Sequence, residues 1–321
     1  EVCGVPVRMQ GAMSRELIAG FLGALTEFQP DFVLSINLSG MDTQGLFAGL
    51  FADLAMPYAA WFVDDPRTIL MGSTAYASDY AFAFTWEAAY CDYLQACGFA
   101  GVEVLPLAVD DTQFNAPPAE AWSLPPSFVG NSMVEFAERE WYWARERPEM
   151  ERALHGAFDR GSVTRETFAF GVEWVLGDAA HGLSAEDLRH CELLCFVEGT
   201  RRLRQGLADA VGPLGVMMRG DGGWAGRAAL YGGPVHYFDE LPAHYHDTPV
   251  NLNVTSVQMA SAVNQRVFDC PAAGGFLLTD AQSSLTTLFD AETELAVYHD
   301  FEECGELSLI HISEPTRPER I

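Results

Sequence analysis

Residues 266–280 read RVFDCPAAGGFLLTD, a short helical stretch followed by two glycines and an apolar run that predicts a buried strand. One cation, Arg266, and one anion, Asp269, stand in this otherwise apolar stretch just before Gly274 and Gly275. An ordinary helix–turn–strand corner explains the pattern. A ligand site at the edge of a parallel sheet explains it as well. Both interpretations predict a strand that begins directly after the glycines.

The composition excludes several classes of function. The 321 residues carry a formal net charge of −27, whereas nucleic acids and anionic membrane surfaces attract basic patches. The apolar runs are too short to span a bilayer. All 18 basic residues are arginine, so neither a Schiff-base lysine nor the lysine of a P-loop is available. We therefore expect no nucleic-acid partner and no transmembrane segment.

The cysteines and the start of the sequence bear on the compartment. Seven cysteines occur without a Cys-x-x-Cys pair, which favours free buried thiols in a reducing compartment over a metal site or disulfide framework. The sequence starts at Glu1 with no basic-then-apolar leader. We expect a cytoplasmic protein and a first lobe that is truncated, because the sequence begins inside a longer one.

The last fifteen residues, LSLIHISEPTRPERI (307–321), differ from the preceding sequence. They carry two of the 18 arginines of this acidic chain and lack its alternation of helical and apolar segments. They resemble the translation of a sequencing adapter, and a genuine extended arm is the alternative. We expect residues 307–321 to contribute nothing to the fold.

Short apolar runs alternate with helical segments, which predicts βαβ units and parallel sheets. Residues 1–115 form the expected first lobe, with strands in DFVLSIN (31–37), YAAWFVDD (58–65), YAFAFTW (80–86) and VEVLPL (102–107). Residues 116–126, rich in proline and alanine, are the expected linker. Residues 127–306 form the second lobe, with strands in SFVG (127–130), GVMMRGDGGW (215–224), GPVHYF (233–238), TPVNLNVT (248–255) and GGFLLTD (274–280).

The second lobe also contains helices. A mixed-charge stretch at about 133–160 is helical in pattern, and a long helix starts at Ser184, whose capping box is completed by Asp187. The basic run RRLR (201–204) lies late in this helix, where positive charge suits the helix dipole, and we expect it to form a solvated face.

Polar residues follow nearly every predicted strand. Ligands of open α/β sheets bind at the carboxyl ends of the strands, which makes these residues candidates, although each one is also explained as a cap or turn residue. They are Asn37, Asp64, Asp65, Thr85, Trp86, Glu87 and Asp110 in the first lobe, and Gly130, Asn131, Ser132, Arg219, Gly220, Asp221, Asn253, Thr255 and Asp280 in the second.

Several segments resemble a known family. VLPLAVDDTQF (104–114) and SFVGNSM (127–133) resemble the segments that close the first lobe and open the second lobe of GT-B glycosyltransferases. The region from GPVHYFDELPAHYH through NQRVFDCPAAGGFLLTD to LFDAETELAVYHDFEE is similar to the C-terminal part of CgeB-like glycosyltransferases, named after a spore maturation protein. PDFVLSIN and PYAAWFVDDP resemble their N-terminal half, so the resemblance covers most of residues 30–303.

This resemblance implies an α/β fold of the GT-B type, in which two Rossmann-like lobes with parallel sheets face each other across a cleft. It implies a bacterial, cytoplasmic hexosyltransferase that needs no cofactor and no metal. The second lobe, with a group 1-like domain, would hold a nucleotide diphosphate sugar. The first lobe would hold the acceptor, which is a glycan, a protein or a small molecule.

The resemblance also assigns roles to the opening stretch. In related GT-B enzymes the position of Asp269 contacts the donor ribose hydroxyls. Gly274 and Gly275 would let the backbone approach the ligand, with a helix N-terminus facing phosphate. Arg266 would bind phosphate, or it would form a salt bridge with Asp269 instead.

Two departures from the family pattern affect the donor site. Ser261 stands where many relatives carry a second acid, so Asn264 is the expected replacement in sugar recognition. The basic pair that often follows the opening strand of the second lobe is missing after Gly130 and Asn131, which leaves Arg219 as the expected substitute.

The catalytic group is predicted in the first lobe. An inverting transferase needs a base that deprotonates the acceptor hydroxyl, and Asp64 is the candidate because it ends a predicted strand. The alternative is that Asp64 or Asp65 pairs with Arg67. His244 and His246 beside Asp247 suggest a metal site, but the resemblance implies transfer without metal.

Other functions remain compatible with the same sequence. A nucleotide-sugar epimerase shares this two-lobe fold, and a non-catalytic protein could bind the nucleotide sugar without turnover. A fragment that lacks the first strand and glycine loop of the first lobe could be inactive.

Overall fold

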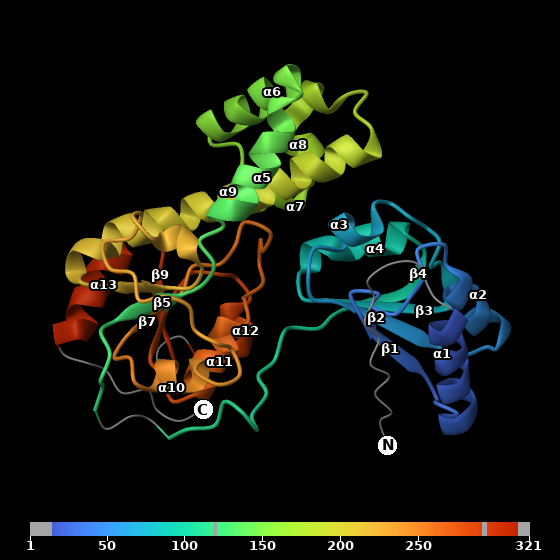
Figure 1. The fold of residues 1–321 in the computed structure, drawn as a ribbon, viewed down its shortest axis with the longest axis horizontal. Coiled ribbons are helices and arrows are strands. Elements are labelled where there is room, and N and C mark those ends of the chain that lie inside the picture. The colour runs from blue at the N-terminus through green and yellow to red at the C-terminus, as the bar shows by residue number, and fades with distance from the viewer. Residues whose placement is uncertain (1–14, 118–120, 291–293, 314–321) are drawn as a thin grey trace. The chain divides into compact units, whose positions relative to one another are not determined.

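The computed structural model describes residues 15–117, 121–290 and 294–313, which divide into two compact units (Figure 1). The first unit ends at Pro106 and the second begins at Leu107. This boundary precedes the one expected at residue 115. The reason is that Phe114 is buried in the second unit, where its ring lies 5.5 Å from that of Tyr237 and 6.5 Å from that of Tyr245.

The first unit contains a parallel sheet of four strands in the order β1-β2-β3-β4. All four strands predicted there are confirmed, because continuous apolar runs are typical of the strands of a parallel sheet. The elements are α1 (Arg15–Phe28), β1 (Val33–Ile36), α2 (Leu46–Asp53), β2 (Tyr58–Phe62), α3 (Pro66–Leu70), β3 (Ser78–Thr85), α4 (Cys91–Ala96) and β4 (Phe99–Val104).

One face of this sheet carries the core of the first unit. Parallel strands that neighbour each other in sequence order, joined by right-handed crossovers, place every connecting helix on the same side. The apolar residues of α1 to α4 accordingly form one cluster with the inward residues of β2 and β3. On the opposite face Leu34, Ile36 and Phe82 remain 53%, 39% and 38% exposed.

The second unit contains a parallel sheet of five strands in the order β6-β5-β7-β8-β9. Its fold is therefore α/β and Rossmann-like, as predicted. The strands are β5 (Ser127–Val129), β6 (Met217–Arg219), β7 (Asn251–Leu252), β8 (Leu277–Asp280) and β9 (Ala296–Tyr298), and the helices around the sheet are α10 (Leu241–His246), α11 (Arg266–Ala272), α12 (Leu285–Leu288) and α13 (Phe301–Ser313).

Two details of this sheet differ from the sequence prediction. The strand expected in GPVHYF is wrong, because residues 234–236 form an irregular segment and a turn follows. The sequence prediction missed β9, which is only three residues long and completes the sheet beside β8.

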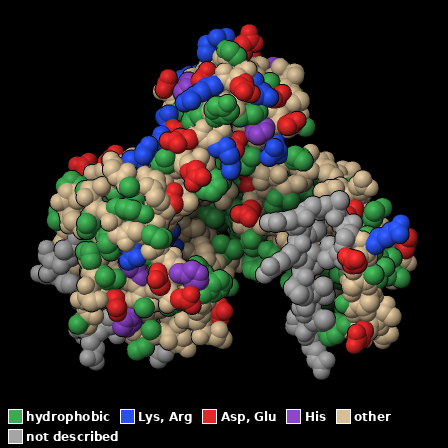
Figure 2. Space-filling view, in the orientation of Figure 1, with side chains coloured by type: hydrophobic (Ala, Val, Ile, Leu, Met, Phe, Trp, Pro, Cys, Tyr) green, Lys and Arg blue, Asp and Glu red, His purple; other side chains and the backbone are tan. Residues whose placement is uncertain are grey.

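A helical insertion lies between β5 and β6. It consists of α5 (Val134–Arg145), α6 (Pro148–Asp159), α7 (Arg165–Ala169), α8 (Val172–Leu176) and the first half of α9 (Ala185–Val211). Figure 2 shows many of the visible arginine side chains on these helices. The predicted start of the long helix is confirmed, because the Ser184 hydroxyl accepts a hydrogen bond from the backbone N–H of Asp187.

Helix α9 connects the insertion to the sheet (Figure 1). Its 27 residues span about 40 Å at 1.5 Å per residue. Leu194 and Cys195 belong to the apolar core of the insertion, whereas Leu207 and Val211 belong to the core that covers the sheet. Helix α9 therefore contributes apolar side chains to both the core of the insertion and the core that covers the sheet.

Helix α13 includes residues that the sequence analysis set apart. It continues past residue 306 to Ser313, with Ser308 fully buried and Leu307 packed against the core of the second unit. The ring of His311 lies 4.5 Å from that of Phe276. Residues 307–313 therefore extend the fold, and the adapter origin of this segment stays a prediction. Among the described helices, none has the length and apolar character needed to cross a membrane.

Candidate functional site

The strand order of the second sheet reverses beside β5. The chain goes from β5 to β6 on one side and then returns to place β7, β8 and β9 on the other side. In open α/β sheets such a switch point leaves a crevice at the carboxyl ends of the strands, where ligands bind. The residues that follow β5 and β7 at this edge are Gly130 to Ser132 and Asn253.

The loop after β5 is held rigidly. The Ser132 backbone N–H and hydroxyl donate to the two carboxylate oxygens of Asp221, at 2.6 and 2.8 Å. The Trp224 indole donates to the Gly130 carbonyl at 2.8 Å. Gly220, with φ of +143°, lies so close that a Cβ there would be 2.2 Å from the Gly130 oxygen. These contacts fix the backbone at the switch point.

Arg266 is the first residue of α11, and its side chain contacts the backbone where this loop begins. Its guanidinium donates to the Val129 carbonyl and to the side-chain oxygen of Asn253, and it lies 4.8 Å from the ring centroid of Phe128. Its Nε is buried without a hydrogen-bond partner. Among the ion pairs of the described residues there is none between Arg266 and Asp269, so the salt bridge considered as an alternative is not formed.

A second arginine at the loop was missed by the sequence analysis. Arg204 belongs to the run RRLR, yet its side chain points inward and donates to the Asn131 carbonyl. Its Nε is also buried without a partner. Burial and the neighbouring charge of Arg266 lower the pKa of the Arg204 guanidinium to about 9. The helical period offered a signal, because Thr200 and Ala208, four residues before and after it, are both buried.

The other arginines of the run behave differently. Arg201 and Arg202 both bind the buried carboxylate of Glu198, each at 2.7 Å. The guanidinium of Arg202 also lies 4.5 Å from the ring centroid of Phe158. The expectation of a purely solvated face is therefore wrong, because the run pairs with a buried acid and packs on the insertion.

Arg219 and Asn264, two predicted donor residues, are engaged with neighbouring groups. Arg219 donates to the carbonyls of Gly233 and Pro234, at 3.2 and 2.7 Å, and so holds the irregular segment after β6. Asn264 donates to the Asn253 side chain at 2.9 Å, and its own side-chain oxygen is buried without a partner. Asn264 therefore belongs to the switch point together with Arg266.

Asp269 lies one turn further along α11 and is only 1% exposed. The Tyr237 hydroxyl donates to one carboxylate oxygen at 2.8 Å, and the Gln265 amide donates to the other at 2.7 Å. Burial raises the pKa of this carboxyl, while the hydrogen bonds and the charge of Arg266 oppose the rise. A carboxylate offers about four acceptor positions, so it retains capacity for a further donor.

The two glycines of the opening stretch lie at the other edge of the sheet, before β8 begins. Gly274 has φ of +74°, and a Cβ there would be 2.5 Å from the Pro117 carbonyl oxygen. A Cβ on Gly275 would be 2.7 Å from the Tyr245 carbonyl oxygen. The structure thus separates Gly274 and Gly275 from the arginines, and the groups that approach them closely belong to the chain itself.

The first unit places two carboxylates after β2. Asp64 is exposed, and the Asn37 amide donates to it at 2.7 Å. Asp65 is buried, caps α3 and binds Arg67 at 2.7 Å, and the Tyr90 hydroxyl donates to it at 3.1 Å. The Arg67 pairing considered for either residue therefore belongs to Asp65, which leaves the exposed Asp64 as the candidate base.

The histidine pair shows no metal-binding arrangement. His244 is buried with its Nε2 2.7 Å from the Ser127 hydroxyl, whereas His246 lies 3.0 Å from Asp247. No cluster of three or more His, Cys, Asp or Glu side chains suited to a metal occurs within residues 15–117, 121–290 and 294–313.

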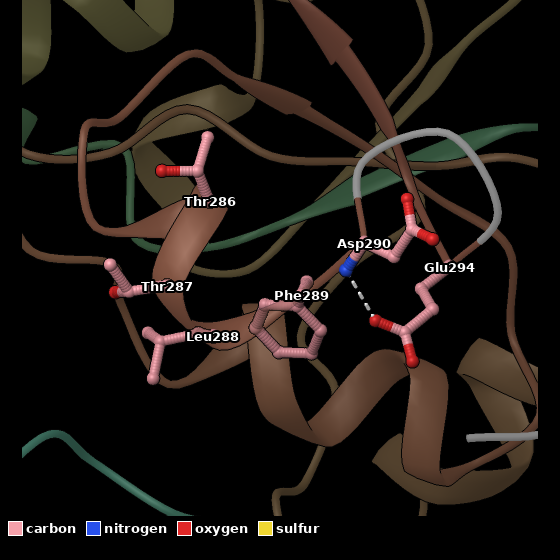
Figure 3. Close-up of a pocket in the computed structure, with 6 residues that line it drawn as sticks. All are labelled: Thr286, Thr287, Leu288, Phe289, Asp290 and Glu294. Atoms are coloured by element: carbon pink, nitrogen blue, oxygen red, sulfur yellow. Dashed lines mark hydrogen bonds between the residues drawn. The ribbon is translucent and has the colours of Figure 1, made fainter.

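A pocket of about 530 Å³ lies elsewhere on the second unit (Figure 3). Thr286, Thr287 and Leu288 line it from α12, together with Phe289. The Asp290 backbone N–H donates to the Glu294 carboxylate at 2.6 Å. The residues that line this pocket include no arginine and no glycine, unlike those of the switch point.

Comparison with known proteins bears mainly on the second unit. Residues 192–320 match a family model described as glycosyl transferase-like. The matched stretch lies within the second unit and includes Arg204, Arg266 and Asp269. A solved structure of sucrose-phosphate synthase from Thermosynechococcus elongatus is similar over 95% of this chain and 72% of that chain, with 9% identity and a TM-score of 0.48. None of the curated proteins matches this sequence.

Proposed function

We propose that this chain is a glycosyltransferase that moves a hexosyl group from a nucleotide diphosphate sugar to a hydroxyl group of an acceptor. The single observation that carries the proposal is the position of Arg266. It lies at the switch point of a glycosyltransferase-like domain, under a rigid glycine loop, with uncharged hydrogen-bond partners. Such a guanidinium suits a phosphate group, which it can bind through paired N–H donors.

The proposed reaction balances without a cofactor or metal. The bond between the anomeric carbon and the diphosphate oxygen breaks, and the nucleoside diphosphate leaves with the bonding electrons. The acceptor oxygen forms the new bond to the anomeric carbon. In an inverting transfer Asp64 takes the proton of the acceptor hydroxyl, which its exposure and position after β2 permit. The acceptor is a glycan, a protein or a small molecule.

Asp269 is the proposed partner of the ribose hydroxyls. Two internal donors already hold its carboxylate in a fixed orientation, and a preorganised acceptor loses little freedom when a ligand binds. The CgeB-like subtype, the bacterial origin and the cytoplasmic location belong to the same proposal and rest on the sequence resemblance.

The test starts with unfolding temperatures in the presence of nucleosides, nucleoside diphosphates and nucleotide sugars. A ligand that binds only the folded state raises the unfolding temperature. We expect stabilisation by nucleoside diphosphates, and we expect product analysis with an acceptor mixture to yield a new glycoside. Conversion of one nucleotide sugar into another, without a glycoside, would identify an epimerase instead.

A variant tests the donor site directly. We expect Asp269→Ala to weaken nucleotide binding by about 1.5–3 kcal/mol, the usual value for hydrogen bonds to a charged group. The matched control is Asp178→Ala, since Asp178 is a fully exposed acid of the same unit. Calorimetric titration of folded protein separates binding from stability. Equal affinities of wild type and Asp269→Ala would remove Asp269 from the donor site.

A further inference from the structure

Arg204 and Arg266 form a pair of partly buried cations on opposite sides of Gly130. Arg204 donates to the carbonyl of Asn131, the residue after Gly130, and Arg266 donates to the carbonyl of Val129, the residue before it. The two guanidiniums come from α9 and α11, which are far apart in the sequence. The backbone of the loop thus brings two positive charges together at the carboxyl end of β5.

These two charges lack a bound acid. Arg204 and Arg266 take part in none of the ion pairs found among the described residues, and their hydrogen-bond partners are uncharged: carbonyl and amide oxygens and, for Arg266, also the Tyr245 hydroxyl. Asp221 is the acid whose charge acts on Arg204, but it is held by Ser132. Two neighbouring like charges that are partly withdrawn from water and have no counter-ion are unfavourable, so an anion that enters between them gains a strong attraction.

The remaining arginines near this edge of the sheet are already neutralised or occupied. Arg165 reaches from α7 to the carboxylate of Asp280. Arg201 and Arg202 share Glu198, and Arg219 holds two backbone carbonyls. Arg219 resembles the pair in having carbonyl partners, but its Nε donates to one of them, whereas the Nε atoms of Arg204 and Arg266 have no hydrogen-bond partner.

We propose that Arg204 and Arg266 together form a diphosphate clamp, in which each guanidinium binds one phosphate group. This inference rests on the proposed function and adds to it a residue, Arg204, to which the sequence analysis gave no role in donor binding. Each guanidinium has five N–H donors in a planar fork, and the buried Nε atoms show that donors on both side chains remain without partners. Two guanidiniums match the two phosphate groups of a diphosphate better than the one group of a monophosphate, because each phosphate can accept from one planar fork.

Calorimetric titration with inorganic pyrophosphate, orthophosphate and sulfate tests the clamp without a nucleotide. We expect the wild type to bind pyrophosphate at least about tenfold more tightly than either single anion, which corresponds to one lost charge-assisted contact. Arg204→Gln should remove this preference. Arg227→Gln is the matched control, because Arg227 is half exposed and pairs only loosely with Glu138 at 3.8 Å. Its pyrophosphate affinity should equal that of the wild type.

Further outcomes separate the clamp from the function. If Arg204→Gln does not fold, Arg204→Lys keeps the charge but loses the fork, and an unchanged pyrophosphate preference in that variant would overturn the clamp. A wild type that binds sulfate as tightly as pyrophosphate would also overturn it. Sugar transfer by wild type and by Arg204→Gln at equal rates and equal donor affinities refutes the clamp alone. Arg204-dependent pyrophosphate binding without any sugar transfer refutes the proposed function alone.

Discussion

The arginine side chains that are partly buried in the two units have different kinds of partner. In the first unit Arg67 is neutralised within the chain, by a short ion pair with Asp65 and by the hydroxyl of Tyr90. In the second unit the hydrogen-bond partners of Arg204 and Arg266 are uncharged groups. A charge that is paired within the chain is costly to separate from its partner, whereas a charge without an acid favours a ligand of opposite sign. This difference supports the proposal that the second unit binds the anion.

The strand orders of the two sheets differ in the same sense as the partners of their arginines. The first sheet runs β1-β2-β3-β4 without a reversal, so it has no switch point among its described strands. The second sheet reverses beside β5, and the unpaired arginines lie there. In the first unit the candidate chemistry is a single exposed carboxylate, Asp64, that follows β2.

The largest effect is expected for catalysis in the first unit. Asp64→Asn should lower the transfer rate about 10²- to 10⁴-fold, the usual contribution of a general base, while the affinity for nucleoside diphosphate stays unchanged. Steady-state kinetics and titration measure the two quantities. Asp53→Asn, at an exposed acid of α2, is the control. An unaltered rate in Asp64→Asn would exclude this residue as the base and weaken the assignment of chemistry to the first unit.

The internal pair of the first unit should be important for stability. Asp65→Ala leaves Arg67 buried without its acid, which should lower the free energy of unfolding by about 3–5 kcal/mol. Urea unfolding followed by tryptophan fluorescence measures this loss, because Trp61 and Trp86 lie in the same unit. Asp64→Asn serves here as the control, since its carboxylate is exposed. A loss below about 1 kcal/mol would mean that the pair is not a stabilising element.

The second unit should respond to acid through His244. Burial and the charge of Arg219 lower the pKa of this imidazole to about 4 in the folded state, whereas its usual value is about 6.5. The unfolded state therefore binds the proton more readily, and stability is lost as pH falls from about 6.5 to 4. The expected loss is about 3 kcal/mol. Unfolding free energies measured across this range should show the slope in the wild type.

A variant identifies the source of that slope. His244→Gln removes the titrating group, so most of the pH dependence between 6.5 and 4 should disappear. His246→Gln is the control, because His246 is partly exposed beside Asp247. An equal slope in wild type and His244→Gln would attribute the acid sensitivity to other groups.

The smallest effect concerns the end of the chain. Leu307→Ala should lower the free energy of unfolding by about 1–2 kcal/mol, since Leu307 packs against the core of the second unit. Leu309→Ala, at an exposed position of the same helix, should change it by less than about 0.5 kcal/mol. If both substitutions had no effect, residues 307–313 would be dispensable, as the sequence pattern suggested.

The fold could be predicted where local signals were strong. The apolar runs of β1 to β4 and the cap at Ser184 are local, and both were predicted from the sequence. β9 is too short for a periodic signal, and GPVHYF has the composition of a strand but contacts Arg219 instead of a neighbouring strand. Whether a short apolar segment pairs with a neighbouring strand depends on tertiary contacts, which the sequence of that segment alone does not contain.

The candidate site was predictable only in part. Arg266 and Asn264 are brought together with the loop after Gly130, and their role in donor binding stays a prediction. Gly274 and Gly275 lie at the opposite edge, because a glycine pair serves close backbone contact of any kind. Arg204 was missed because a run of arginines suggests solvent, while the helical period separates its members into different environments.

The uncovered face of the first sheet has a thermodynamic consequence. Leu34, Ile36 and Phe82 are already in contact with water in the native state, so unfolding adds less apolar hydration there than a sheet covered on both faces would add. The heat-capacity increment of unfolding grows with newly exposed apolar area, by about 0.45 cal/K/mol per Å². The first unit therefore has a smaller increment for its size and a flatter dependence of stability on temperature than the second.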